Sequence, residues 1–326
     1  MRGRYYMKTP ILEESNYSSV MINEVEPFLA ERRNEGTFNS FDGRPISYEY
    51  YITDNAKASV VISHGFTESA EKFREMSYYF INEGYNVFAI THRGHGASYK
   101  ESIDPYTVYV SEFNDYIKDF YTFIKRIVMP NSDSLPLYLY AHSMGGAIAA
   151  LTLEQYPDIF KKAVLNAPMI HFKSPLPIPM AKVITGTEVF LGRGKHPVIT
   201  TKPFDANRTY EQSHDTSKAR FDYYQKKRVD NVNYQTSRPS YSWVRQAIKI
   251  IPVMLDENNC KNVKADVLLF QAGRDTSVEL PAQDEFISKI PSGELVSFPE
   301  AKHEIYMAEN KTLKEYLDRL FDFLEE

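Results

Sequence analysis

One serine stands where its hydroxyl could act as a nucleophile. Ser143 lies in Ala141-His142-Ser143-Met144-Gly145, between a β-rich run and a helical pattern. The segment departs by one residue from Gly-x-Ser-x-Gly, the sharp strand-to-helix turn that exposes a serine oxygen at a sheet edge. Such a turn needs small residues two before and two after its apex, and Ala141 meets that need. The pattern predicts a strained Ser143 that faces the amino terminus of a helix.

A serine hydroxyl needs a base to remove its proton and an acid to orient that base. His303 lies in a loop between the last expected strand and the last expected helix, which suits the base. Asp275 suits the acid because Gly273 allows a tight exit from the preceding strand, whereas Asp284 lies inside an expected helix. The order nucleophile, acid and base along the chain, here Ser143, Asp275 and His303, is typical of one of the folds that carry such a triad. The remaining histidines after the serine fall in an irregular insertion: His171, His196 and His214.

Acyl transfer also needs N–H donors for the oxyanion that forms on the substrate. We expect the Met144 amide to be one donor, because it begins the helix after the serine. The second should come from the loop after an earlier strand. In Ser63-His64-Gly65-Phe66, Gly65 lets the chain turn so that the Phe66 amide points inward.

Several histidines gather near other expected strand ends without a metal-binding pattern. His92 and His95 are three residues apart, and His64 and His142 follow other strands, but no H-x-H-x-D or H-E-x-x-H arrangement is present. Cys260 is the one cysteine, so neither an internal disulfide nor a multi-thiolate zinc site can form. We therefore expect no metal and no cofactor.

The elements that must position these residues alternate between strands and helices from Thr37 onward. Strands separated by helices imply right-handed crossovers and a mostly parallel sheet with helices on both faces. The expected strands are 46–52, 59–63, 86–91, 137–141, 162–166, 266–271 and 294–298, and the expected helices are 71–83, 110–128, 147–156, 280–289 and 310–325.

The alternation stops in a segment rich in proline, aromatic and basic residues. We expect residues 168–264 to form a cap (lid) insertion, either a lid over the strand ends or a packed helical decoration. The core is then 37–167 and 265–326, and residues 1–36 are an extension that packs on it. Within the cap, Lys226, Lys227 and Arg228 could attract a phosphate headgroup or an anionic membrane surface, but a solvated face is the favoured interpretation.

Composition limits the class of protein. The chain has 326 residues, of which 43% are apolar, enough for a large buried core. A net charge of −5, with both signs mixed along the chain, disfavours a nucleic-acid partner. The amino terminus lacks the apolar run of a signal peptide, and the longest stretch without charged residues, 134–153, is interpreted as strand, turn and helix. We expect a cytoplasmic protein and leave its oligomeric state open.

These motifs together resemble the α/β-hydrolase superfamily, and more closely its monoacylglycerol lipase and lysophospholipase group. The resemblance rests on His64-Gly65, Arg93-Gly94-His95-Gly96-Ala97-Ser98, the Ser143 turn, Gly273-Arg274-Asp275 and His303-Glu304, in that order. It covers nearly the whole chain from about Gly36, and 203–207 and 238–244 look like the cap of lysophospholipase L2-type proteins.

What the resemblance implies is a serine esterase of lipid metabolism, with Ser143 as nucleophile, His303 as base, Asp275 as its partner, and Phe66 and Met144 as oxyanion donors. The substrate would be a carboxylic ester with a medium or long acyl chain, a lysophospholipid or monoacylglycerol. Transient contact of the cap with a membrane surface stays open beside the favoured solvated face. Two alternatives stay open: an amidase or aminopeptidase that uses the same triad, and a catalytically silent ligand-binding module on the same fold.

Overall fold

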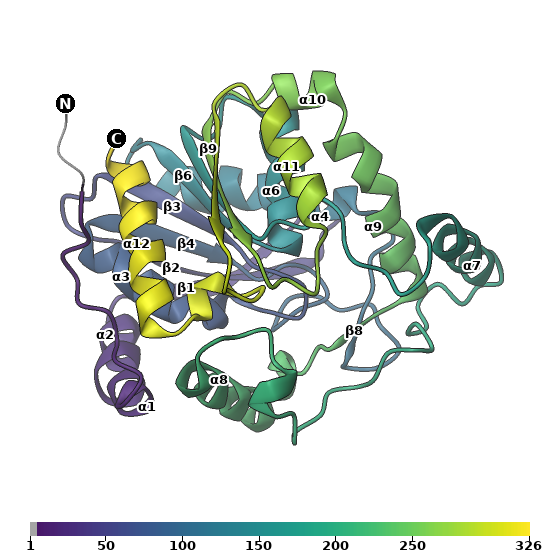
Figure 1. The fold of residues 1–326 in the computed structure, drawn as a ribbon, viewed down its shortest axis with the longest axis horizontal. Helices are drawn as coiled ribbons and strands as arrows, with labels where there is room; N and C mark the ends of the chain where they lie inside the picture. The colour runs from purple at the N-terminus through teal and green to yellow at the C-terminus, as the bar shows by residue number, and fades with distance from the viewer. Residues whose placement is uncertain (1–4) are drawn as a thin grey trace.

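The computed structural model describes residues 5–326, which form an eight-stranded sheet between two layers of helices (Figure 1). The strands lie in the order β1-β2-β4-β3-β6-β7-β9-β10; β1 and β2 are antiparallel to their neighbours and the rest are parallel. Their bounds are β1 Arg33–Asn39, β2 Pro45–Tyr51, β3 Ala58–Ser63, β4 Tyr85–Ile90, β6 Leu137–His142, β7 Lys162–Asn166, β9 Asp266–Ala272 and β10 Gly293–Phe298. The expected mostly parallel sheet is confirmed.

Two hydrophobic clusters fill the space between the sheet and its helices, one on each face. Helices α4, α6 and α11 cover one face, and α3 and α12 cover the other. Their bounds are α3 Arg74–Asn82, α4 Asn114–Phe123, α6 Met144–Gln155, α11 Leu280–Lys289 and α12 Asn310–Glu325. Central strands such as β3 and β4 are buried along their whole length, as expected for parallel strands covered on both faces.

The amino-terminal extension packs against the second cluster. Short helical segments run from α1 (Tyr17–Val20) through the π-helix Met21–Val25 to α2 (Glu26–Ala30), and Tyr17, Met21, Val25 and Leu29 are buried. Strand β1 begins at Arg33, so the sheet starts before the expected boundary at 37. Residues 1–4 of the expected extension lie outside the described part of the chain.

The segment between β7 and β9, here named the cap, places α7 at the projecting right end of the molecule and α8 below the sheet (Figure 1). Its helices are α7 (Ile178–Phe190), α8 (Lys218–Asp230), α9 (Tyr241–Met254) and α10 (Glu257–Lys261). Strand β8 (Arg238–Pro239) pairs with β5 (Thr107–Val108), and Ser242 donates a hydrogen bond to the Val110 carbonyl at 2.7 Å. Because the chain around Val110 is extended against the cap, α4 begins at Asn114 and not at the expected residue 110.

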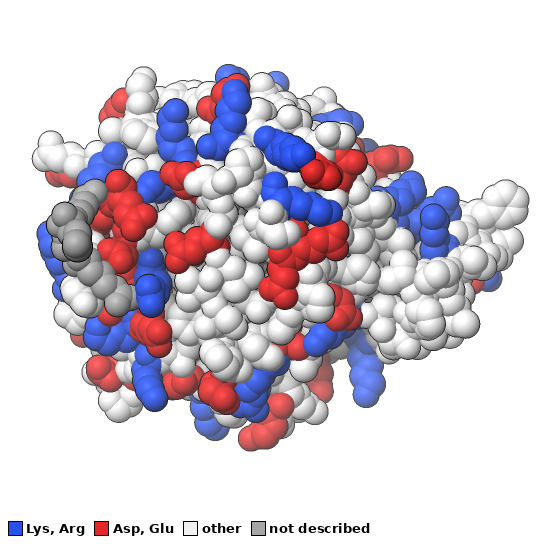
Figure 2. Space-filling model, turned by 45° about the horizontal axis from the view of Figure 1, so that its top comes forward, with Lys and Arg blue, Asp and Glu red and all other residues white. Residues whose placement is uncertain are grey.

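The surface carries mixed charge, with acidic and basic side chains interspersed over the face shown in Figure 2. Within residues 5–326, no helix is long and apolar enough to cross a bilayer, and the uncharged stretch 134–153 is divided among a loop, β6, the serine turn and α6 as expected.

A buried carboxyl on α6 makes stability depend on pH. Glu154 is 5% exposed, its Oε1 has no hydrogen-bond partner, and burial together with the negative charge of Asp256 raises its pKa to about 8. In the unfolded chain a glutamate loses its proton near pH ~4.3. The folded chain therefore holds an extra proton between these values, and stability falls as pH rises through that window.

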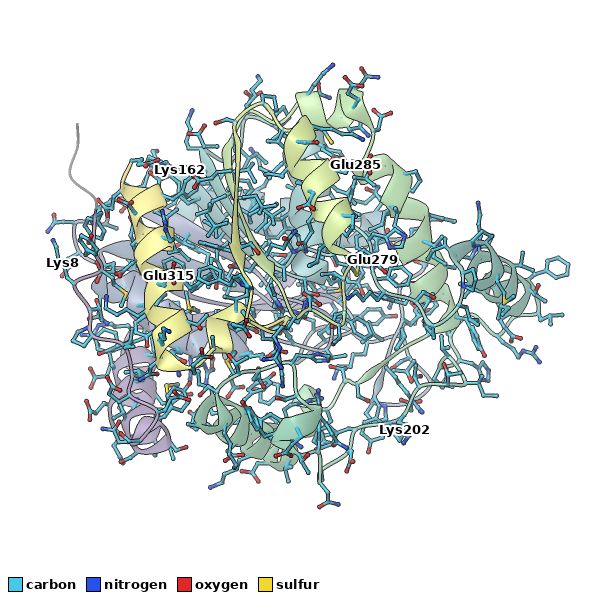
Figure 3. All side chains as sticks on the ribbon, viewed as in Figure 1. Lys8, Lys162, Lys202, Glu279, Glu285 and Glu315 are labelled. Carbon is cyan, nitrogen blue, oxygen red and sulfur yellow. The ribbon has the colours of Figure 1, made fainter. Side chains whose placement is uncertain are left out.

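We predict that Glu154→Gln removes this dependence. The variant should gain in Tm relative to the parent chain as pH rises from 5 to 8, measured by thermal denaturation. Glu315→Gln, at an exposed position on α12 (Figure 3), is the matched control and should leave the pH profile unchanged. Parallel pH profiles for the parent chain and Glu154→Gln would contradict the prediction.

Candidate active site

The turn after β6 holds Ser143 in a backbone conformation that side chains rarely adopt. Its φ is 51° and its ψ is −117°. Gly145 explains why the turn can be so tight: an added Cβ there would overlap the backbone oxygen of Ser63 on β3 and lie 2.5 Å from that of His64. Helix α6 starts at Met144, so its unpaired N–H groups lie beside the serine. The sharp turn predicted from the small residues is present.

Three side chains from different strand ends form one hydrogen-bonded line. His303 Nε2 lies 2.9 Å from Ser143 Oγ, and His303 Nδ1 lies 2.6 Å from Asp275 Oδ2. Ser143 follows β6, Asp275 follows β9 and His303 follows β10. Because these strands are parallel, their carboxyl ends meet at one edge of the sheet. The structure thus brings together the three residues singled out by their order.

Hydrogen bonds hold the carboxylate of Asp275 in place as the acceptor for His303. Its second oxygen, Oδ1, accepts hydrogen bonds from the backbone N–H groups of Ser277 at 2.7 Å and Val278 at 3.1 Å. Burial acts to raise the pKa of Asp275, but His303 and these two N–H groups outweigh it and lower the pKa below its usual range. The carboxylate therefore stays ionised at neutral pH and holds the imidazole in one orientation.

The loop after β3 approaches the serine closely. A Cβ added at Gly65 would lie 3.1 Å from Ser143 Cβ and 2.8 Å from His142 Nδ1. The Gly65 N–H donates to Glu68 Oε2 at 2.6 Å, and the Phe66 ring packs on Trp243 of the cap with 4.3 Å between centroids. Phe66 therefore lies on a restrained loop and lines the same cavity as the nucleophile.

Sequence reasoning missed a buried network of charges next to this loop. Lys72 donates to Glu68 at 3.0 Å and to Glu304 at 2.6 Å, and Glu68 also accepts from Tyr306 at 2.7 Å. Burial opposes the charge on each group, yet the mutual attraction raises the pKa of Lys72 and lowers the pKa of both glutamates. The i, i+4 spacing of Glu68 and Lys72 was the available signal, whereas the contact with Glu304 spans 232 residues.

The remaining histidines near the strand ends have protein partners. His92 lies 2.8 Å from Ser63 Oγ through Nε2, and its backbone N–H donates to His64 Nε2 at 2.9 Å. Burial lowers the pKa of His64 to about 4 and of His95 to about 3, so both are neutral. Within residues 5–326, no three His, Cys, Asp or Glu side chains are grouped to hold a metal ion.

A cavity of about 430 Å³ lies between the cap and the core and is lined by Ser143 and His303. Side chains of the cap and of the core extend into the space between their ribbons (Figure 3). The lining is partly apolar and partly charged. The apolar members are Phe66, Met169, Phe172, Phe221, Trp243 and Val278, and the acidic and basic members are Glu68, Lys72, Arg208, Asp215, Arg228 and Glu304.

Comparison with known proteins agrees with this geometry. Residues 54–310 match the model of the family described as "Serine aminopeptidase, S33" (Hydrolase_4). The chain belongs to this family. The match includes the loop after β3, the serine turn and the Asp275 and His303 loops, and it spans the whole cap.

Individual relatives carry lipase and esterase names. The chain is 27% identical over 308 residues to lysophospholipase L2 of Escherichia coli, covering 90% of this chain and 87% of that protein. Its fold is similar to a thermostable carboxyl esterase from Bacillus coagulans (15% identity, 90% and 97% coverage, TM-score 0.72) and to a monoglyceride lipase from Saccharomyces cerevisiae (18%, 90% and 96%, 0.69). These solved structures confirm the expected α/β-hydrolase fold.

We predict that Gly145→Ala lowers ester hydrolysis by about 100-fold or more, because the new methyl group must push the serine turn away from β3. Ala141→Gly is the matched control: it restores the consensus glycine and removes one buried methyl, at a stability cost of about 1 kcal/mol. Its kcat/KM for p-nitrophenyl butyrate should stay within about threefold of the parent chain. Full activity in Gly145→Ala would contradict the proposed role of the turn.

Proposed function

We propose that this chain hydrolyses carboxylic esters of medium or long acyl chains, lysophospholipids or monoacylglycerols, through an acyl intermediate on Ser143. The observation that carries the proposal is the continuous line from Ser143 Oγ through His303 to Asp275, with separations of 2.9 and 2.6 Å. Family membership and the names of the relatives support ester hydrolysis as the general reaction.

In the proposed mechanism, His303 Nε2 takes the proton of Ser143 as Oγ attacks the ester carbonyl carbon. Asp275 holds the His303 Nδ1–H and stabilises the imidazolium that forms. The carbonyl oxygen becomes an oxyanion, which the backbone N–H groups of Met144 and Phe66 would stabilise. The position of Met144 at the positive end of α6 supports this role.

Collapse of that intermediate expels the alcohol, which takes the proton from His303 and leaves an acyl group on Ser143. A water molecule then attacks the acyl carbon while His303 again accepts a proton. The second collapse releases the carboxylic acid and returns the proton to Ser143. The two steps consume one ester and one water, so the reaction needs no cofactor as a reactant.

The apolar part of the cavity supports an acyl-chain substrate. Phe66 and Trp243 pack together next to Ser143, and Met169, Phe172 and Val278 continue the apolar lining. A volume of about 430 Å³ lies within the range of small-molecule pockets. Apolar lining of this kind gains free energy for each methylene group that leaves water.

A second candidate is suggested by the description of the family as an aminopeptidase. An aminopeptidase must hold the charged α-amino group of its substrate, and two ionised carboxylates, Glu68 and Glu304, line the cavity. Both already bind Lys72, at 3.0 and 2.6 Å. Lys72 thus takes up part of the acceptor capacity of each carboxylate, and the apolar lining beside Ser143 favours esters.

We predict that the chain hydrolyses p-nitrophenyl acyl esters at least about 100-fold faster than matched aminoacyl arylamides. Ser143→Ala should abolish ester turnover because, among residues 5–326, no other hydroxyl is hydrogen-bonded to His303. Initial rates with a matched panel of substrates test both points. Faster arylamide cleavage would favour the aminopeptidase, and undiminished ester hydrolysis by Ser143→Ala would refute the assignment of the nucleophile.

We also propose that the cap contacts a lipid surface through α7. The exposed apolar side chains of this projecting helix and of the residue after it are Met180, Val183, Ile184, Phe190 and Leu191. The projecting tip is mostly uncharged in Figure 2. Lys182, on the same helix, is exposed and would attract anionic headgroups. The exposed Lys202 lies on a loop of the cap, away from α7 (Figure 3).

We predict that Val183→Asp with Phe190→Asp reduces sedimentation of the chain with vesicles of phosphatidylglycerol and phosphatidylcholine. Hydrolysis of water-soluble p-nitrophenyl acetate should not change, since neither residue lines the cavity. Equal sedimentation of the parent chain and the double variant would contradict the proposed contact.

A further inference from the structure

Two arginines of the cap line the cavity that contains Ser143. Arg228, on α8, is only 8% exposed. Its Nε donates to the Tyr234 carbonyl at 2.9 Å and its Nη2 to the Thr236 carbonyl at 3.0 Å. The guanidinium is therefore held in place by backbone groups, and the solvated face favoured from the sequence is wrong for Arg228.

A second arginine of α8 shows what is unusual about Arg228. Arg220 lies about two helical turns earlier, is fully buried, and pairs with Glu75 at 2.8 Å. Within the described part of the chain, Arg228 has no carboxylate at ion-pair distance, and its Nη1 makes no hydrogen bond to the protein. A buried charge without a counter-ion is strongly unfavourable, so the cavity is suited to a ligand that supplies one.

The rest of the cavity offsets this charge only from a distance. Glu68 and Glu304 share one cation, Lys72, at 3.0 and 2.6 Å. Their remaining negative charge acts to raise the pKa of Arg228, but neither carboxylate lies at ion-pair distance from its guanidinium. Burial and the neighbouring Glu304 raise the pKa of Asp215 well above its usual range, which favours its neutral form. Arg208 adds a second cation: it also lines the cavity, donates to the Gln212 carbonyl at 2.7 Å, and has no ion pair among residues 5–326.

Arg208 and Arg228 line the same cavity. Burial is the main factor that lowers the pKa of Arg228, and the positive charge of Arg208 also lowers it, whereas Tyr224, Glu304 and Glu68 act to raise it. Two guanidinium groups in one cavity offer several N–H donors, which suit the oxygens of a phosphate. Both come from the part of the cap around α8, whereas Trp243 of the apolar lining comes from α9 (Figure 1).

We propose that Arg228 and Arg208 form a subsite for the phosphate group of the substrate headgroup, so that the chain prefers phosphate-bearing acyl esters to neutral ones. This inference rests on the proposed function, since it places the headgroup beside the ester that Ser143 attacks. It separates the two substrate classes left open above and favours a lysophospholipid over a monoacylglycerol.

The kinetic test compares lysophosphatidylglycerol with monoacylglycerol of the same acyl chain. Arg228→Met should lower kcat/KM about 10-fold or more for the phosphate ester and less than about threefold for the neutral ester. Arg208→Met, which removes only one backbone contact, should show the same selectivity with less risk to folding. Arg238→Met is the matched control: this cap arginine pairs with Asp104 outside the cavity lining and should leave the ratio of the two substrates unchanged.

Equal losses of kcat/KM on both substrates, which leave the ratio of the two substrates unchanged, would mean that Arg228 only supports the cap. That result would overturn the subsite.

A binding test does not depend on hydrolysis. Titration calorimetry of the Ser143→Ala chain with glycerol 3-phosphate should show binding that weakens about 10-fold or more with Arg228→Met, and inorganic phosphate distinguishes a headgroup site from a site for the free ion. If the chain cleaves no ester yet binds glycerol 3-phosphate through Arg228, the proposed function fails and the subsite stands. Absence of binding overturns the subsite.

Discussion

The close approach of the serine turn to β3 is the constraint on which the site depends. A side chain at Gly145 would occupy the space of the Ser63 and His64 carbonyl oxygens, so only glycine lets α6 begin this near the neighbouring strand. The strained backbone of Ser143, with φ at 51°, follows from the same approach. Packing of β6 between β3 and β7 holds the strain in place, because relief would break both strand pairings.

Buried charge is the second organising factor. Lys72 joins Glu68 of the β3 loop to Glu304, the residue after His303, so one ion-pair network restrains both loops. Arg220 does the same between the cap and the core through Glu75. These groups are costly to bury singly but stable together, and they fix segments that are far apart along the chain. Arg228 departs from this rule, which is why it indicates a ligand.

Local patterns were sufficient to predict much of this arrangement. Alternating apolar runs located the parallel strands, and small residues around Ser143 located the turn. The Asp275 and His303 loops followed from chain order and strand context. In each case the signal lies within a few residues, and the meeting of parallel strand ends at one sheet edge supplies the rest.

What sequence reasoning missed depends on contacts between distant segments. The helical character of 17–30 and the start of β1 at Arg33 follow from packing against the second hydrophobic cluster and from pairing with β2. The run Lys226-Lys227-Arg228 looks uniform in sequence, but Lys227 pairs with Glu26 and Glu71 while Arg228 faces the cavity. No local pattern distinguishes adjacent cations whose partners lie elsewhere in the chain.

In this site, His303 makes the Ser143 oxygen reactive. Intact-mass spectrometry after exposure to a fluorophosphonate, followed by peptide mapping, measures that reactivity. We expect one covalent adduct per chain, located on Ser143, and labelling slower by about 100-fold or more in His303→Ala. No adduct, an adduct on another residue, or undiminished labelling of the His303 variant would contradict it.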